Sequence, residues 1–156
     1  MIGVYLNDHL AGSVTALEML SHLEPAYPDL ASFVARLRTD IEEDQEELKA
    51  LLQKMGIGRS LLRRAAGWLT EKLAELKLRL DDPARGSLRL LEALETLSLG
   101  IEGKRGLWQA LERASAFNTH LQGLNYGRLL KRAEDQRASV EQERLKAAVA
   151  VMRTQV

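Results

Sequence analysis

Charged side chains that could do chemistry stand on the apolar lines of predicted helices. Asp44 follows Ile41 at the helical spacing of three residues, and Lys104 follows Ile101 in the same way. A carboxylate or ammonium group held in an apolar interior must meet a metal ion or an opposite charge, because an unpaired buried charge costs several kcal/mol. These two positions therefore predict either a ligand site or an internal ion pair.

The residue types needed for covalent or acid–base catalysis are poorly represented. The chain has no cysteine and no Gly-x-Ser-x-Gly elbow, and none of its three histidines has an obvious serine and acid partner. Glu18 and His22 are one helical turn apart, but such pairs are common on solvated helices. The other histidines are His9 and His120. The sequence favours a protein that is not an enzyme.

Composition fits one soluble domain over residues 1–156. Lys plus Arg number 22 and Asp plus Glu number 22, so no overall field attracts nucleic acid or an anionic membrane, and aromatic residues are only 4% of the chain. The N-terminus lacks the pattern of a signal peptide and no apolar run approaches about 20 residues, so the sequence does not predict a membrane protein. The lack of cysteine suits a reducing compartment, and we expect a cytoplasmic protein.

The spacing of apolar residues predicts an all-α fold. Leucines recur at intervals of three and four, no strand-like alternation occurs, and all three prolines fall in two short breaks. Asp29 is a plausible N-cap, and Gly56 is well placed to end a helix. The predicted helices cover residues of about 4–24, 29–55, 60–80, 87–114 and 126–152. The first two and the last two should form antiparallel hairpins, with 60–80 as a crossover helix.

Two short phrases recur in the same order along the chain. Ala-Leu-Glu-Met-Leu-Ser at 16–21 returns as Ala-Leu-Glu-Thr-Leu-Ser at 93–98, and Glu-Asp-Gln at 43–45 returns at 134–136. The first match keeps its leucines in phase, whereas the second does not keep the apolar stripes aligned. The repeats suggest a pseudo-symmetric bundle of two related hairpins.

This layout resembles the ferritin-like superfamily, specifically a small bacterial member with degenerate metal ligands. The resemblance covers essentially the whole chain and implies an antiparallel four-helix bundle. In metal-binding relatives the first and third helices each supply a Glu, and the second and fourth each supply Glu-x-x-His. The matching positions in this chain are Glu18; Glu95 or Glu102; Glu42 with Gln45; and Ala133 with Gln136.

The chain departs from the family at these positions. Both histidines of the pattern become Gln and one bridging Glu becomes Ala. A glutamine carbonyl is a weak, neutral ligand where the metal prefers an imidazole nitrogen. We therefore expect no metal cofactor, and the alternative is a protein that binds two iron or manganese ions.

If the metal is lost, the remaining carboxylates need other partners. Our hypothesis is an internal salt-bridge and hydrogen-bond network that fixes helix register where relatives hold metal. Its predicted members are Glu18, Asp44, Glu95, Glu102, Lys104, Gln136, Arg137 and Arg144. The alternative is that each charge lies at the edge of its stripe and reaches out to water.

Three glycines at intervals of three residues interrupt the predicted helix over 87–114. Gly100, Gly103 and Gly106 each cost about 1 kcal/mol of helix propensity relative to Ala. A bend or a tight helix contact explains such a series most simply. The alternative is a cavity beside Trp108 that admits a small molecule.

The predicted helix at 60–80 is basic and amphipathic, with Trp68 near its apolar edge. Such a helix can lie on a membrane or bind a partner. Because the run from Asp40 to Glu47 contains six acids that can neutralise it, packing within the chain is the preferred interpretation.

The sequence therefore predicts a non-enzymatic, ferritin-like helical bundle that acts through protein association, with a homodimer as one form. Two alternatives stay open. The first is a di-iron or di-manganese oxidase or metal-storage protein. The second is a protein that binds a membrane or a partner through residues 59–80.

Overall fold

Among the described residues, four long helices pack together as a bundle. The computed structural model describes residues 1–57 and 86–153. The helices are α1 (Ile2–Ala26), α2 (Ala31–Lys54), α4 (Gly86–Ala114) and α5 (Tyr126–Arg153), and single 3₁₀ turns cover Pro28–Leu30 and Thr119–Leu121. These ranges contain no strand, so the all-α prediction is confirmed for them. The predicted helix at 60–80 and its crossover role lie outside the described residues.

Local sequence explains where the helices stop. At the end of α2, Gly56 has a φ of +67°, its N–H donates to Gln53 O, and the N–H of Ile57 donates to Leu52 O. This is a Schellman cap, in which glycine adopts the left-handed conformation without steric cost. Asn125 is the N-cap of α5, because its Oδ1 accepts a hydrogen bond from the N–H of Arg128.

One predicted cap is wrong. Asp29 lies inside the 3₁₀ turn instead of capping α2, and the residue that precedes the helix, Leu30, makes no side-chain cap. Pro28 begins the 3₁₀ turn one residue before Asp29. Because this turn runs directly into α2, the chain bends into the helix without a separate capping residue.

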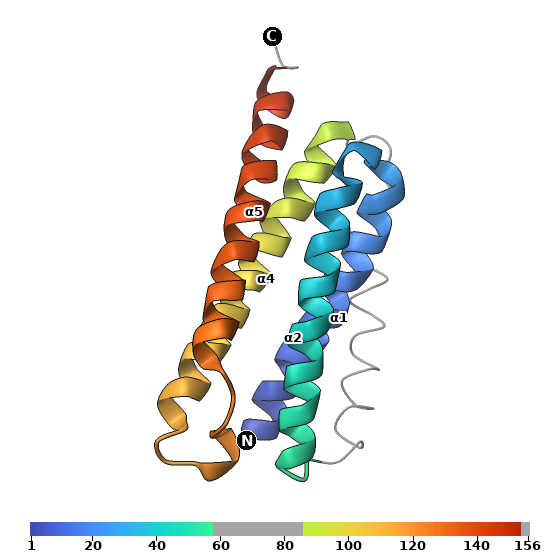
Figure 1. Cartoon of the computed structure of the whole chain (residues 1–156). Helices are drawn as coiled ribbons and strands as arrows, with labels where there is room; N and C mark the ends of the chain where they lie inside the picture. The colour runs from blue at the N-terminus through green and yellow to red at the C-terminus, as the bar shows by residue number, and fades with distance from the viewer. Residues whose placement is uncertain (58–85, 154–156) are drawn as a thin grey trace.

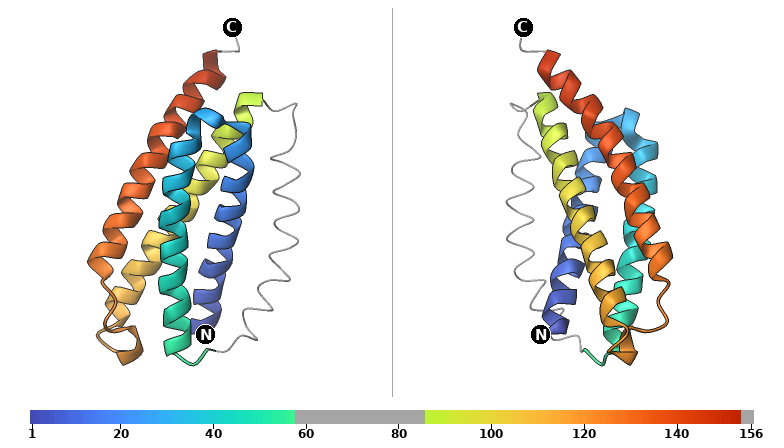
Figure 2. Two further views of the ribbon diagram at one scale, coloured as in Figure 1. Left: turned by 45° about the vertical axis from the view of Figure 1, so that its right-hand side comes forward. Right: turned by 90° about the vertical axis from the view of Figure 1, so that its left-hand side faces the viewer.

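The directions of the helices define the topology. In Figures 1 and 2, α1 and α2 are antiparallel, α4 and α5 are antiparallel, and α2 and α4 run in the same direction. Backbone contacts join α1 to α2, α4 to α5, α1 to α4, and α2 to α5. The pairs α1/α5 and α2/α4 therefore lie on the diagonals of a four-helix bundle.

The interior consists of two apolar clusters with polar residues between them. One cluster surrounds Leu20, Leu37 and Leu94, and the other surrounds Leu6 and Trp108. Asp44 lies on α2 between Ile41 of the first cluster and Leu48 of the second. Lys104 lies in the same way on α4, and Gln136 of α5 is also buried. The bundle thus has a polar layer near the middle of its length.

Within the described ranges, no helix carries an apolar stretch long enough to cross a membrane.

Candidate functional site

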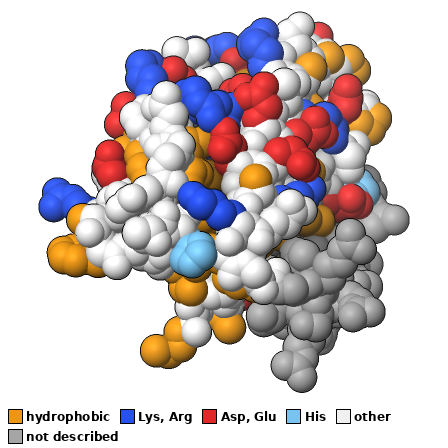
Figure 3. Space-filling view, turned by 60° about the horizontal axis from the view of Figure 1, so that its bottom comes forward, with side chains coloured by type: hydrophobic (Ala, Val, Ile, Leu, Met, Phe, Trp, Pro, Cys, Tyr) orange, Lys and Arg blue, Asp and Glu red, His pale blue; other side chains and the backbone are white. Residues whose placement is uncertain are grey.

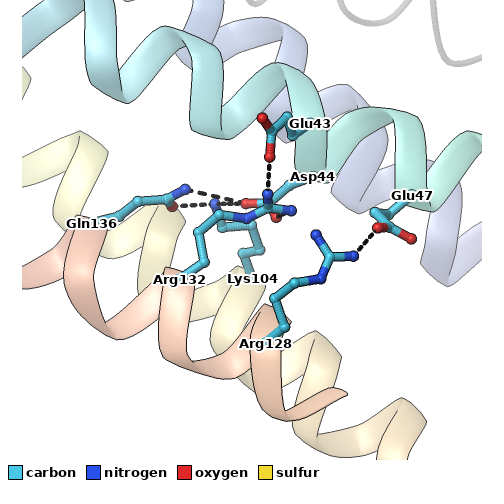
Figure 4. Close-up of polar contacts among 7 residues, drawn as sticks. All are labelled: Glu43, Asp44, Glu47, Lys104, Arg128, Arg132 and Gln136. Atoms are coloured by element: carbon cyan, nitrogen blue, oxygen red, sulfur yellow. Dashed lines mark hydrogen bonds and ion pairs between the residues drawn. The ribbon is translucent and has the colours of Figure 1, made fainter. Parts of the chain in front are cut away.

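Side chains from three helices meet in the polar layer. Asp44 of α2 is 3% exposed and Gln136 of α5 is 2% exposed, and Lys104 reaches them from α4 (Figure 4). Lys104 Nζ lies 2.5 Å from Asp44 Oδ2 and also donates to Gln136 Oε1. Gln136 Nε2 donates to the same Asp44 oxygen at 3.3 Å. The Lys104–Asp44 contact spans the α2/α4 diagonal, so it ties the two hairpins together through the interior.

A second cation meets the other oxygen of Asp44. Arg132 Nη2 lies 2.5 Å from Asp44 Oδ1, as an ion pair without hydrogen-bond alignment, and Arg132 Nη1 also pairs with Glu43. Asp44 is therefore held by one cation at each oxygen. We call Asp44, Lys104, Arg132 and Gln136 the central cluster.

Burial affects the charges in and around the central cluster. It lowers the pKa of the Lys104 ammonium from its ordinary value, and the Asp44 carboxylate opposes this shift. Asp40, one turn before Asp44, shows the opposite direction. Burial raises the pKa of its carboxyl above the ordinary value, Arg132 opposes the shift, and the charge of Asp44 adds to it.

Further ion pairs extend this arrangement to the surface along the line where α2 meets α5. Arg132 pairs with Glu43, and Arg128, one turn earlier, pairs with Glu47 (Figure 4). In Figure 3 acidic and basic side chains are interspersed on the visible face instead of forming patches of one sign. We call the ion pairs Arg132–Glu43 and Arg128–Glu47, which join α2 to α5, the ionic seam.

The structure brings together three of the eight residues predicted for the internal network, namely Asp44, Lys104 and Gln136. The other five lie outside the interior: Glu18, Glu95, Glu102, Arg137 and Arg144. Glu102 pairs with Arg105 and Arg137, Glu95 pairs with Arg144, and Glu18 lies 3.3 Å from His22. These five stand at the margins of their stripes, where water stabilises the charges, as the alternative interpretation expected.

Arg132 is the member that sequence reasoning missed. It lies four residues before Gln136, so the two share one face of α5. Its helical spacing from Gln136 was the available signal. Because a long arginine can reach either the core or water, that signal alone did not assign it to the interior.

The residues carried over from the metal-binding pattern are not gathered at one place. Glu18, Glu42 and Glu95 are exposed, and Glu102 is half-buried but pairs with arginines. Gln45 is buried, but its amide donates to Ser13 Oγ at 3.0 Å and accepts from Lys49 at 2.9 Å. Over residues 1–57 and 86–153 no group of three or more His, Asp or Glu side chains lies close enough to hold a metal ion. Two cations beside Asp44 further disfavour such an ion, so these residues do not fit a di-metal centre.

A cavity of about 560 Å³ opens between α1, α2 and α4, on the other side of the central cluster. Asp44 and Lys104 belong to both the cluster and the cavity wall. Most of the remaining wall is apolar or glycine: Gly12, Ala16, Met19, Ile41, Leu48, Leu97, Leu99, Gly100, Ile101, Gly103, Leu107 and Trp108. Its size is typical of small-molecule sites.

Glycines form part of the cavity wall. A Cβ atom placed at Gly12, Gly100 or Gly103 would have no described atom within 4 Å. The expected tight helix contact at Gly100 and Gly103 is therefore not found among the described residues, whereas the alternative, a cavity beside Trp108, is present. Gly106 is equally open but does not line the cavity.

Trp108 and His9 belong to the cavity wall in different environments. Trp108 is 1% exposed, and among the described residues its buried indole Nε1 has no acceptor. His9 is half-buried and packs edge-on against Tyr5, and burial lowers the pKa of its imidazole despite the nearby Asp8 charge. In contrast, Ser13 and Gln45 satisfy each other.

No protein-family model, curated protein or solved structure matches this chain.

Proposed function

We propose that this protein is a non-enzymatic, ferritin-like bundle that acts by binding, and that the cavity between α1, α2 and α4 is its binding site. The observation that carries the proposal is the cavity itself. It has a volume of about 560 Å³ and a largely apolar wall. A concave, largely apolar pocket with a few convergent polar groups is the usual form of a small-molecule site.

The helix directions support the ferritin-like part of the proposal. The order is up, down, down, up, with α2 and α4 parallel. Ferritin-like bundles have one long connection that joins two antiparallel pairs in this way. In our proposal the central cluster occupies the interior position that holds metal in the metal-binding relatives, and it fixes the register of the two hairpins.

A neutral fluorescent probe tests the binding function. N-phenyl-1-naphthylamine should bind the full chain saturably, with increased emission. Gly103→Leu should weaken this binding by at least about tenfold, because the new side chain fills the cavity. Gly106→Leu is the matched control, since it makes the same change three residues later on α4, outside the cavity wall. Circular dichroism verifies that both variants fold.

The proposal fails if the wild-type chain does not bind the probe saturably. It also fails if Gly103→Leu and Gly106→Leu bind it equally well, because the bound probe would then lie elsewhere.

A specific observation also favours association with a second copy of this chain. Leu145, Val149 and Met152 lie at helical spacing on α5 and are 52%, 48% and 71% exposed. This part of α5 extends past the end of the α1–α2 hairpin (Figure 1). An exposed apolar stripe of this kind is suited to an isologous dimer. Sedimentation equilibrium should show a dimer that Leu145→Glu dissociates, and a wild-type monomer at every concentration would contradict it.

A further inference from the structure

We propose that the cavity between α1, α2 and α4 binds a long, unbranched aliphatic chain, which lies extended along the bundle axis between α1 and α4. This inference rests on the proposed binding function and names the class of ligand that the cavity takes. Three observations carry it: the length of the cavity wall, the way its two ends correspond on α1 and α4, and the positions of its glycines.

The cavity wall is long in the direction of the helix axes. On α1 it extends from Asp8 to Met19, and on α4 it extends from Thr96 to Trp108. At a rise of about 1.5 Å per residue, each of these stretches is about 17 Å long. A spherical cavity of about 560 Å³ would be only about 10 Å across. The cavity is therefore elongated, and its shape matches an extended ligand better than a compact one.

The two ends of the wall correspond on α1 and α4. Leu10 of α1 packs in the same apolar cluster as Leu107 of α4, and Met19 of α1 packs in the same cluster as Leu97 of α4. Because these two helices are antiparallel (Figure 1), their lining stretches lie beside each other over the same length. One extended ligand can therefore contact both helices from end to end.

Glycines keep this length continuous. Gly12 of α1 and Gly100 and Gly103 of α4 lie between the ends of the wall, and a Cβ atom at any of them would have no described atom within 4 Å. A large side chain at these positions would divide the cavity into shorter parts. Since Met19 and Leu97 and most of the other described wall residues are apolar, a hydrocarbon chain would bury its surface along the whole wall.

The length of the wall sets the length of the chain. A fully extended chain advances about 3.6 Å for every three bonds. A primary alcohol of about twelve carbons, with the radii of its end atoms, therefore extends over about 17 Å. Each buried methylene should strengthen binding by about fourfold until the wall is filled.

A series of primary alcohols tests the inference on the full-length protein. 1-Hexanol, 1-octanol, 1-decanol and 1-dodecanol differ only in chain length, and each should displace N-phenyl-1-naphthylamine from the cavity. Their affinities, measured by equilibrium dialysis, should rise by about fourfold for each methylene up to about twelve carbons. Cyclododecanol is the compact counterpart, because it has the carbon number and the hydroxyl group of 1-dodecanol. It should bind at least about tenfold more weakly, after correction for the partition of both alcohols between water and octanol.

The Gly103→Leu variant tests whether the chain follows α4. The new side chain stands seven residues from Thr96 and five from Trp108, so the longer open stretch of wall would be about 10 Å. Affinity in this variant should stop rising at about 1-hexanol. Gly106→Leu, outside the cavity wall, should keep the wild-type dependence on chain length.

The inference is overturned if the alcohols do not displace N-phenyl-1-naphthylamine, or if the wild-type affinity already stops rising at 1-hexanol. It is likewise overturned if cyclododecanol binds as tightly as 1-dodecanol after correction, or if Gly103→Leu and Gly106→Leu show the same dependence on chain length. In each case saturable binding of N-phenyl-1-naphthylamine that Gly103→Leu weakens would still support the proposed binding function, so the two failures are distinguishable.

Discussion

The two lines along which the hairpins meet differ in chemistry. Between α2 and α5, Arg132 and Arg128 pair with Glu43 and Glu47 in the ionic seam. Between α1 and α4 there is an apolar cavity bordered by glycines. The α2–α5 side of the bundle is thus joined by charge, whereas the described residues of the α1–α4 side leave the cavity that we propose as a binding site.

The central cluster connects the two sides. Asp44 and Lys104 face the cavity, and Arg132 joins Asp44 to the ionic seam. A pair of hairpins that packed only through apolar contacts could slide past one another, whereas a buried ion pair has one favourable register. In this account the charges fix the register, and the bundle can therefore tolerate a cavity beside them.

Removal of the Asp44 charge should cause the largest loss of stability. Asp44→Asn leaves Lys104 buried without its counter-ion, and breaking a buried pair on one side costs about 3–5 kcal/mol. We expect a loss of this size in the free energy of unfolding, measured by urea denaturation at pH 7.

Glu42 is exposed on the same helix, so Glu42→Gln is the control. It should change the free energy of unfolding by less than about 0.5 kcal/mol. The double variant Asp44→Leu with Lys104→Met should recover much of the loss, since neither charge remains. Equal stability of Asp44→Asn and Glu42→Gln would show that the central cluster does not support the fold.

Substitution of two arginines one turn apart on α5 distinguishes the stability contribution of an interior ion pair from that of a surface ion pair. The Arg132 side chain is 12% exposed and contacts Asp44, whereas Arg128 is about half exposed and contacts Glu47. Arg132→Ala should cost about 2 kcal/mol, and Arg128→Ala at most about 1 kcal/mol, in urea denaturation. Losses of the same size would contradict the separation of the central cluster from the surface pairs.

A substitution in the cavity wall should raise the free energy of unfolding, whereas the substitutions above lower it. Gly103→Ala should raise the free energy of unfolding by about 1 kcal/mol, because helix propensity improves and the described residues leave the added methyl group free of contact. Gly3→Ala provides the comparison, since its Cβ would lie 3.2 Å from Ile57 and should gain less. If Gly103→Ala destabilises the protein, the glycine serves a close contact and the cavity interpretation is wrong.

The smallest effect concerns Asp40. Because burial raises the pKa of this carboxyl, the folded state holds its proton more strongly than the unfolded chain does. The ionised carboxylate therefore destabilises the fold as pH rises from the ordinary pKa through the folded pKa, and the cost is complete above the folded pKa. Asp40→Asn should be more stable than wild type at pH 7, and the difference should vanish below a pH of about 3.8.

Urea denaturation at both pH values measures this change. A difference that is independent of pH would mean that the substitution acts through packing or hydrogen bonding instead of ionisation. Glu42→Gln is again the matched exposed control.

Much of the fold could be predicted from the sequence because leucine spacing and helix breakers are local signals. Leu20, Leu37 and Leu94 fall on the predicted stripes and are buried, and Gly56 ends α2 as expected. The repeats were less informative. Gln45 and Gln136 correspond and are both buried, but Asp44 is buried and its counterpart Asp135 is exposed. Three matching letters therefore do not fix equivalent environments.

The candidate site could be predicted only in part. Asp44 and Lys104 lie between apolar residues of their own helices, and this pattern indicated their burial. Glu18, Glu95 and Glu102 were expected inside on the strength of the family pattern, but small rotations about a helix axis decide whether a glutamate faces the core or water. The cavity depends on three helices at once, and only the spacing of the glycines hinted at it.

The central claim is that the side chains of Lys104 and Arg132, and not metal ions, neutralise Asp44. The metal content of the protein tests this claim most directly. The protein should be purified without chelator or affinity nickel, loaded anaerobically with iron or manganese, and measured by elemental mass spectrometry. Our account predicts far less than one metal per chain and an unchanged midpoint of urea unfolding. A content near two metals per chain, lost in the Glu18→Ala variant, would contradict it and would indicate a di-metal carboxylate protein.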